Sequence, residues 1–291
     1  MNIPQVLATY DEEYARTYDA KFILHPHYKQ KTDFEIETLR RLLAKRGCWL
    51  DVACGTGYFL SQFPGVPRAG LDLSPAMLAI ARQANPDALF LREGNFGDDV
   101  AEWEGRWALV TCMWYSYGYA SSMTALRGLI RNLARWTSDD GACFVPICDP
   151  ENLGRRIRLP YRHPNTGFPP ETLLITGVTW TWSESSGKHH PDMVAPQVDA
   201  MVAMFAEHFD VVELVPYPRF KWWSPRRRKA LLARAKKRKG ASQGLEREEV
   251  QRSIARVIPS QPSGSSSAAD ARGTGEGSTR LNTSDPGSRM K

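Results

Sequence analysis

Short apolar runs alternate with helical segments along the first 150 residues, and this alternation constrains the fold more than any other feature. A chain that repeats strand and helix in this order builds a parallel sheet covered by helices on both faces. The predicted strands are 48–53, 69–73, 88–93, 107–114, 142–148, 211–217 and a last, edge strand at 229–235. The pattern therefore predicts an α/β fold with a doubly wound, Rossmann-like sheet of seven strands.

The remaining segments divide the chain into further parts. Residues 1–31 are predicted to be an N-terminal lid region, 32–240 the main domain, and about 150–195 a small substrate-binding insertion containing a hairpin that turns at 185–187. From 241 to 291 aromatic residues are absent, and Ser, Gly, Thr and charged residues dominate. Such a composition buries too little apolar surface to offset its ordering entropy, so we expect a disordered tail.

Composition limits the cellular location of the protein and the kinds of metal or disulfide chemistry that it can carry. No stretch reaches the roughly 18 apolar residues of a membrane-spanning helix, and the N-terminus lacks a signal-peptide pattern, so we expect a cytoplasmic protein. The five cysteines form no C-x-x-C pair and are expected to be reduced, and no spacing of His, Cys and carboxylates predicts a metal site.

The net charge of +6 is concentrated in one basic segment, residues 225–239, which carries nine Lys or Arg and no acidic residue. Such a cluster can bind nucleic acid, but it can equally flank a surface strand. Because the rest of the chain is net acidic, the sequence argues against nucleic acid as a partner.

The sequence DVACGTGYF, residues 51–59, places a Gly-rich turn between a buried strand and a helix. Gly55 and Gly57 allow the sharp bend and the close approach of a ligand that such a turn requires. A dinucleotide-binding fold needs a third glycine, and Leu60 stands there, which favours a nucleoside cofactor without phosphates. Asp51, at the strand end, is placed to hold a cationic amino-acid group.

A second carboxylate, Asp72, follows 21 residues later near the end of the run AGLDL. At the tip of the second strand it can accept both hydroxyls of a ribose. Its alternative role is a helix cap, but Ser74 occupies the better capping position. The ribose role is therefore favoured.

The motifs DVACGTG and GLDLSPAMLAIAR together resemble the class I S-adenosylmethionine-dependent methyltransferases over about residues 32–149. The resemblance implies S-adenosyl-L-methionine as cofactor. It also places Asn95, where the family has an acidic residue, at the adenine amine, with Phe96 beside it. The remaining cofactor contacts implied are Ala53, Leu73, Met77 and Met113.

A narrower similarity links CMWYSYGYASS and the Tyr18-Asp19 pair to sugar-amine N-methyltransferases acting on nucleotide-linked amino sugars. It implies a cofactor contact by Tyr18. Tyr10, Tyr14 and Tyr18 recur every four residues, so on a helix they share one face. That face can be a lid over the cofactor or ordinary core packing.

The acceptor site is less defined. Trp114 and Tyr117, in the aromatic stretch after the fourth strand, are expected to bind a small acceptor. Arg155 and Arg158, in an Arg-rich stretch, can bind an anionic acceptor or lie in a solvated loop. His163 is the candidate general base. The other histidines are expected at the surface or in packing: His25, His27, His189, His190 and His208.

These features predict an enzyme, a methyltransferase acting on a small molecule such as an amino sugar, at nitrogen or oxygen. One alternative is a nucleic-acid methyltransferase that uses the basic segment, although the segment CMWYSYG lacks the turn that grips a flipped base. The other alternative is a binding module for the cofactor without catalysis.

Overall fold

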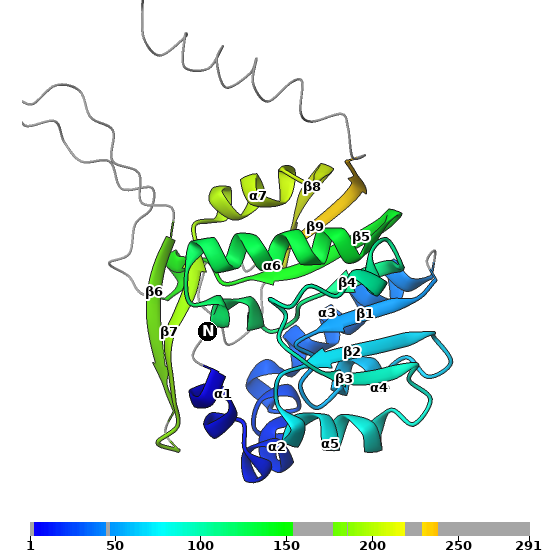
Figure 1. The fold of residues 1–291 in the computed structure, drawn as a ribbon. Coiled ribbons are helices and arrows are strands. Elements are labelled where there is room, and N and C mark those ends of the chain that lie inside the picture. The colour runs from blue at the N-terminus through cyan, green and yellow to red at the C-terminus, as the bar shows by residue number, and fades with distance from the viewer. Residues whose placement is uncertain (1–2, 45–46, 154–176, 185, 219–228, 238–291) are drawn as a thin grey trace, which may run out of the picture. The chain divides into compact units, whose positions relative to one another are not determined.

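The computed structural model describes residues 3–44, 47–153, 177–184, 186–218 and 229–237 of the chain. Within these residues the sheet order is β3-β2-β1-β4-β5-β9-β8, and the first five of these strands run parallel. The strands are β1 Trp49–Val52, β2 Arg68–Asp72, β3 Phe90–Glu93, β4 Trp107–Thr111, β5 Thr137–Ile147, β8 Phe209–Pro216 and β9 Lys229–Lys236. The seven-stranded, doubly wound sheet predicted from the alternation is confirmed (Figure 1).

The placement of the last strand corrects the prediction of an edge strand at 229–235. Strand β9 lies between β5 and β8 and runs antiparallel to both, so β8 forms that edge of the sheet. Burial explains the position, because Ala230, Leu231 and Ala233 are fully buried in β9, whereas only Phe209 of β8 is buried. The order in which the strands appear along the chain does not reveal this reversal.

Helices cover both faces of the sheet, as the alternation predicts. Their bounds are α1 Ile3–Thr9, α2 Glu12–Tyr18, α3 Pro26–Leu43, α4 Tyr58–Ser61, α5 Pro75–Ala84, α6 Met123–Trp136 and α7 Val198–Ala206. Shorter turns of helix are η1 Asp19–Ile23, η2 Ala101–Trp103, η3 Ser116–Ala120 and η4 Pro150–Asn152. Helices α6 and α7 pack on one face with Leu50 and Val110, while α3, α4 and α5 pack on the other with Trp49 and Leu109.

The predicted hairpin exists as a separate two-stranded sheet, β6 Gly177–Ser183 and β7 His189–Pro196. Its turn closes through a hydrogen bond from the Gly187 N–H to the Glu184 carbonyl oxygen, 3.0 Å apart. Strand β7 packs against η3, which follows β4. The hairpin and the N-terminal helices therefore lie at the end of the sheet where its parallel strands finish (Figure 1).

Several predicted boundaries shift in the structure. Helix α3 begins at Pro26, inside the region 1–31 that the sequence assigned to the N-terminal lid, because Pro26 occupies its first turn and His25 caps it. Strand β5 begins at Thr137 rather than at residue 142. The tail 241–291 and most of the Arg-rich stretch lie outside the described residues, so the predicted domain limits stay predictions.

Two further findings concern the described residues alone. None of their helices combines the length and the apolar composition needed to cross a bilayer, and a cytoplasmic location stays a prediction. All five cysteines are free, and four of them are buried.

Candidate cofactor and acceptor site

A cavity opens where β1, β2 and β4 end. Doubly wound folds bind ligands outside the carboxyl ends of their strands, and this cavity has that position. The predicted residues that line it are Tyr18, Asp51, Ala53, Gly55, Asp72, Leu73, Met77, Phe96, Met113 and Trp114. Among the described residues, three of the predicted ones do not line it: Gly57, Asn95 and Tyr117.

The turn after β1 has a strained backbone at the cavity wall. Ala53, Gly55 and Gly57 have φ values of 59°, 56° and 69°, in the left-handed region that favours glycine. A Cβ on Gly57 would lie 2.6 Å from Asn85 Nδ2 and 3.0 Å from Ala81 Cβ. Gly57 therefore supports the site from behind, by letting the turn pack against α5.

Asp51 points into the cavity from the buried strand β1. Its Oδ1 accepts a hydrogen bond from Thr111 Oγ1 at 2.6 Å, while Oδ2 is buried without a partner among the described residues. Burial raises the pKa of this carboxyl to about 7, although the Thr111 hydroxyl opposes the shift. A buried carboxylate oxygen without a partner is a ready acceptor for a cationic group.

Asp72 ends β2 on the adjacent side of the cavity. Its Oδ2 accepts from the Gly55 N–H at 2.7 Å and its Oδ1 from the Ser74 N–H at 2.9 Å. Burial raises the pKa of the Asp72 carboxyl, against these backbone donors. Ser74 caps α5 by accepting from the Met77 N–H, as the sequence indicates. The remaining lone pairs of Asp72 are free to accept further hydroxyl donors.

The segment after β3 departs from the expectation for adenine. Phe96 lines the cavity, but the Asn95 amide oxygen accepts from the Gly97 N–H at 2.8 Å in a local turn. The Asn95 N–H in turn donates to Asp98. Asn95 is thus engaged in shaping the loop, while the apolar Leu73, Met77 and Phe96 form the cavity wall nearby.

The segment after β4 is also strained. Trp114 and Tyr115 have φ values of 54° and 62°, which is uncommon for aromatic residues and concentrates strain at the site. Beneath Trp114 lies the buried ammonium of Lys31, 3.7 Å from the ring centroid and 3.0 Å from Glu35. This buried cation fixes the Trp114 ring at the cavity wall.

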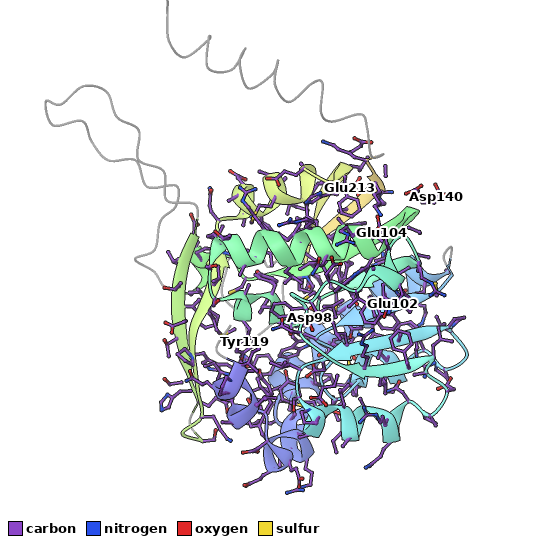
Figure 2. All side chains as sticks on the ribbon, in the orientation of Figure 1. Asp98, Glu102, Glu104, Tyr119, Asp140 and Glu213 are labelled. Atoms are coloured by element: carbon purple, nitrogen blue, oxygen red, sulfur yellow. The ribbon has the colours of Figure 1, made fainter. Side chains whose placement is uncertain are left out.

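Tyr117 belongs to the core and not to the cavity wall. It is 1% exposed, and its hydroxyl accepts from the Cys148 N–H at 2.7 Å. Tyr119, two residues further along η3, lines the cavity instead. In Figure 2 it lies beside α1 and the hairpin, on the opposite side of the molecule from Asp140.

The N-terminal helices close one side of the cavity. Helix α1 ends at Thr9 and α2 begins at Glu12, with Asp11 as its N-cap. The three tyrosines therefore do not share one continuous helix. Tyr10 and Tyr18 line the cavity, whereas the Tyr14 hydroxyl donates to Glu184 on the hairpin. Tyr10 and Tyr18 therefore border the cavity and Tyr14 packs against the hairpin, while a lid role over a cofactor stays a prediction.

Asp19, which follows Tyr18 in the Tyr-Asp pair, connects the N-terminal helices to the Gly-rich turn through a hydrogen bond. Its Oδ1 accepts from Thr56 Oγ1 at 2.6 Å. Burial raises the pKa of the Asp19 carboxyl. The hydrogen bond places Tyr18 over the cavity.

Sequence reasoning missed a polar cluster between the lid and the hairpin, formed by Tyr10, Tyr119, Glu184 and His190. His190 is 1% exposed and its ring stacks on Trp182 at 4.6 Å, so of the two predicted alternatives, surface or packing, the structure shows packing. No sequence motif marks this cluster, because its members come from the N-terminus, from η3 and from the hairpin. The aromatic spacing around Tyr119 was the one signal available.

The other predicted acceptor residues, Arg155, Arg158 and His163, lie outside the described residues. Part of the basic segment is described: Arg234 pairs with Glu213 at 2.7 Å, and the Lys236 ammonium donates to the carbonyl oxygens of Arg135 and Thr137. These two cations of β9 therefore form interactions within the protein, with the edge strand β8 and with the start of β5.

Comparison with known families identifies the chain. A family model described as a methyltransferase domain matches residues 27–191, and the chain belongs to this family. The match spans the Gly-rich turn, the strand-2 motif and the hairpin as far as Pro191 in β7. It confirms the family recognised from the sequence motifs.

The curated relatives that the chain matches are N,N-dimethyltransferases of dTDP-linked amino sugars. The chain is 36% identical over 157 residues to the dTDP-3-amino-3,6-dideoxy-alpha-D-glucopyranose N,N-dimethyltransferase of Streptomyces fradiae, covering 50% of this chain and 58% of the relative. It is 32% identical over 113 residues to the dTDP-4-amino-2,3,4,6-tetradeoxy-D-glucose N,N-dimethyltransferase of Saccharopolyspora spinosa, covering 38% and 44%. The chain thus spans about half the length of the curated relatives it matches.

Solved structures share the fold. An S-adenosylmethionine-dependent methyltransferase from Clostridium acetobutylicum superposes with a TM-score of 0.52 at 15% identity, covering 76% of this chain and 97% of the other. DesVI from Streptomyces venezuelae superposes with a TM-score of 0.50 at 21% identity, covering 76% and 97%. At these identities the likeness shows the Rossmann-like fold alone.

Proposed function

We propose that this chain transfers a methyl group from S-adenosyl-L-methionine to the amino nitrogen of a nucleotide-linked amino sugar. The observation that carries the proposal is the cavity at the strand ends, which combines the unpartnered Asp51 oxygen with the Asp72 carboxylate. The family match and the names of the curated relatives support both the reaction and the class of acceptor.

The residues at the cavity fit such a cofactor. Asp51 Oδ2, which has no partner in the part of the chain that the structure describes, accepts a cationic amino group, and Asp72 keeps lone pairs for ribose hydroxyls. Leu73, Met77 and Phe96 supply an apolar wall for the base. When bound, the cofactor supplies a methyl group already activated on a sulfonium, so the protein needs to orient the acceptor and exclude water.

The lid and the segment after β4 perform that orientation in this proposal. Tyr10 and Tyr18 close the cavity on one side, and Trp114 borders it on the other. Tyr117 stands behind this wall and fixes the start of the segment after β5 through Cys148. Arg155 and Arg158 are proposed to bind the diphosphate of the acceptor by bidentate contacts.

Two alternatives are less well supported. A nucleic-acid methyltransferase would use the basic segment, but Arg234 and Lys236 are engaged with Glu213 and with backbone carbonyls. A module that binds the cofactor without catalysis is less well supported, because the curated relatives that the chain matches are named as methyltransferases.

Calorimetry and product analysis test the proposal together. Calorimetric titration should detect binding of S-adenosyl-L-methionine and of its demethylated product. Mass spectrometry should then find one or two added methyl groups on dTDP-3-amino-3,6-dideoxy-α-D-glucopyranose, and none on a short RNA. Binding without methylation of any amine in a panel would favour the non-catalytic module, and methylated RNA would favour the nucleic-acid enzyme.

A further inference from the structure

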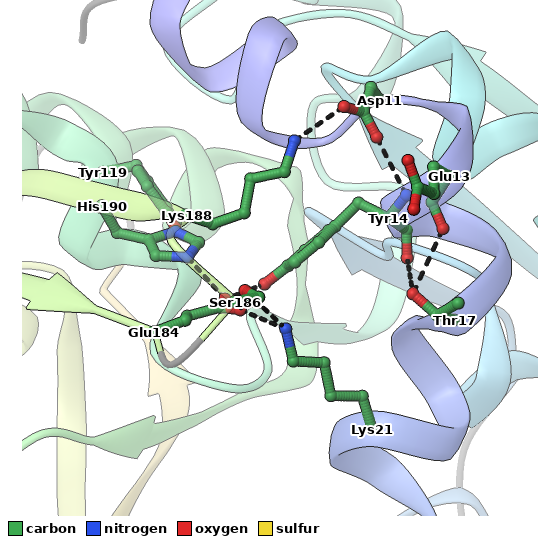
Figure 3. Close-up of polar contacts among 10 residues, drawn as sticks. All are labelled: Asp11, Glu13, Tyr14, Thr17, Lys21, Tyr119, Glu184, Ser186, Lys188 and His190. Atoms are coloured by element: carbon green, nitrogen blue, oxygen red, sulfur yellow. Dashed lines mark hydrogen bonds and ion pairs between the residues drawn. The ribbon is translucent and has the colours of Figure 1, made fainter.

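A hydrogen-bonded chain leads from the cavity wall into the hairpin. The Tyr119 hydroxyl lies 2.6 Å from His190 Nδ1, and His190 Nε2 lies 2.8 Å from Glu184 Oε1 (Figure 3). Tyr119 lines the cavity, whereas the side chains of His190 and Glu184 are at most 2% exposed. The chain thus joins a cavity-facing hydroxyl to a buried imidazole and a buried carboxylate.

Charge and protonation set the direction of these hydrogen bonds. Glu184 accepts from Lys21, Tyr14, His190 and Ser186, and although burial acts in the opposite direction, these donors lower the pKa of its carboxyl to about 2. An ionised carboxylate only accepts, so His190 Nε2 carries a proton and donates it to Glu184.

The other nitrogen of His190 is then unprotonated. Burial lowers the pKa of the His190 imidazole, with smaller contributions from the charges of Lys21 and His189, while Glu184 opposes the shift. The ring is therefore neutral near pH 7, and its bare Nδ1 accepts the Tyr119 O–H. The Tyr119 oxygen keeps its lone pairs for a donor in the cavity or for Tyr10, whose hydroxyl is 2.7 Å away.

This arrangement suits an acceptor amine. A primary or secondary amine near neutral pH carries a proton that must leave before its lone pair can attack a methyl group. Resting on the proposed function, we propose that Tyr119, His190 and Glu184 form a proton relay that deprotonates the acceptor ammonium. Tyr119 touches the acceptor and is the catalytic residue, and His190 and Glu184 act through it.

The relay balances in protons and charge. The ammonium N–H bond breaks and its proton passes to the Tyr119 oxygen, while the Tyr119 proton passes to His190 Nδ1. The positive charge moves from the ammonium to the imidazolium, where the Glu184 carboxylate stabilises it. The acceptor nitrogen is left with a free lone pair, and a second methylation needs the same step again.

A second cavity beside the relay offers the proton a route away from it. It is lined by both Tyr119 and His190, and Thr9 and Asp192 also border it. Asp192 has a φ of 54°, a strained conformation for a residue other than glycine. Water that enters this second cavity would take the proton from the imidazolium and so reset the relay without passing through the cavity proposed to hold the acceptor.

Two variants interrupt the relay at different atoms. Tyr119→Phe removes the hydroxyl, and His190→Asn retains a hydrogen-bonding group near Nδ1 that cannot take a proton. With dTDP-3-amino-3,6-dideoxy-α-D-glucopyranose as acceptor, each should lower kcat/KM at pH 7 by about 10²- to 10⁴-fold, the usual contribution of a positioned base. The penalty should shrink as pH rises, because solvent then deprotonates the amine.

Controls separate a relay from simple positioning. His208→Asn replaces another histidine whose pKa is lowered by burial, between α7 and β8 and outside both cavities, and should retain wild-type kcat/KM. All three variants should keep wild-type affinity for S-adenosylhomocysteine. A loss confined to acceptor KM and equal at every pH would overturn the relay, because a merely structural contact behaves in that way.

A spectroscopic measurement tests the relay in the intact protein. Nitrogen NMR of the wild-type protein at pH 7 should show His190 protonated at Nε2 and bare at Nδ1, whereas the opposite tautomer would overturn the relay even if a variant fails to fold. A wild-type protein that does not methylate the amino sugar overturns the proposed function itself. Wild-type turnover with both variants fully active overturns the relay alone.

Discussion

Asp51→Asn should separate the stability of the empty site from its affinity for a cationic ligand. The wild-type carboxyl is 1% exposed, and burial raises its pKa to about 7 from a reference value of 3.8. The folded protein therefore holds a proton that the unfolded chain releases. This contribution to stability is fully present below the unfolded pKa and is lost as pH rises through the folded pKa of about 7.

The shift gives the size of the effect. A difference of about three pKa units corresponds to roughly 4 kcal/mol across the whole titration, of which about 3 kcal/mol falls between pH 5 and pH 8. The asparagine variant has no proton to lose there. Between these two pH values the wild-type melting temperature should fall about 6–12 °C further than that of the variant.

Asp51→Asn removes a loss of stability at neutral pH, but it should weaken the affinity for a cationic ligand. None of the described residues pairs with Asp51 Oδ2, so a cationic amino group that binds there forms a charge-assisted hydrogen bond. Losing that bond costs about 1.5–3 kcal/mol, which is roughly a 10- to 150-fold weaker affinity for S-adenosylhomocysteine. Calorimetry at pH 7 in two buffers of different ionisation enthalpy should also detect release of about half a proton by the wild type and none by the variant.

Two results would refute this reasoning. Parallel melting curves of wild type and variant between pH 5 and pH 8 would show that Asp51 does not titrate in that range. Unchanged affinity together with identical buffer dependence would show that the unpartnered oxygen does not meet the ligand.

Asp72→Ala should weaken binding of S-adenosylhomocysteine by about 1–3 kcal/mol, and unchanged calorimetric affinity would argue against a ribose contact. Gly57→Ala should lower the free energy of unfolding in urea by more than about 1 kcal/mol, because the new Cβ meets α5 at a left-handed position. Gly55→Ala, with a similar φ but open space around its Cβ, is the matched control and should lose less. Arg155→Ala and Arg158→Ala should each raise the acceptor KM by a factor that falls at high salt, without changing cofactor affinity. Acceptor kinetics equal to those of the wild-type protein in both variants would mean that these arginines do not bind the acceptor.

The sequence was sufficient for the sheet and for the side of it that binds ligand. Buried parallel strands are continuous apolar runs, and a Gly-rich turn between strand and helix has few local alternatives, so Asp51 and Gly55 could be placed from sequence neighbours alone. Asp72 could be placed in the same way, because one strand and one turn determine its position. These predictions depend on interactions between residues close in sequence.

The tertiary structure decided the rest. The antiparallel position of β9 between β5 and β8 depends on burial across the sheet, which no local pattern contains. Tyr117 and Tyr119 are separated by one residue in the same aromatic stretch, yet one fills the core and the other lines the cavity, because a turn of 3-10 helix points them apart.

The polar cluster that includes Tyr119 shows most clearly what sequence patterns cannot predict. Glu184 and His190 face each other across a hairpin, and Tyr14 and Lys21 reach them from more than 160 residues away in sequence. A histidine on a strand has no periodicity that distinguishes a surface position from a buried one with two polar partners. The sequence determined the strands and the turn that form the cavity, because those depend on local apolar pattern and backbone conformation, whereas only folding decided which distant polar groups were buried together.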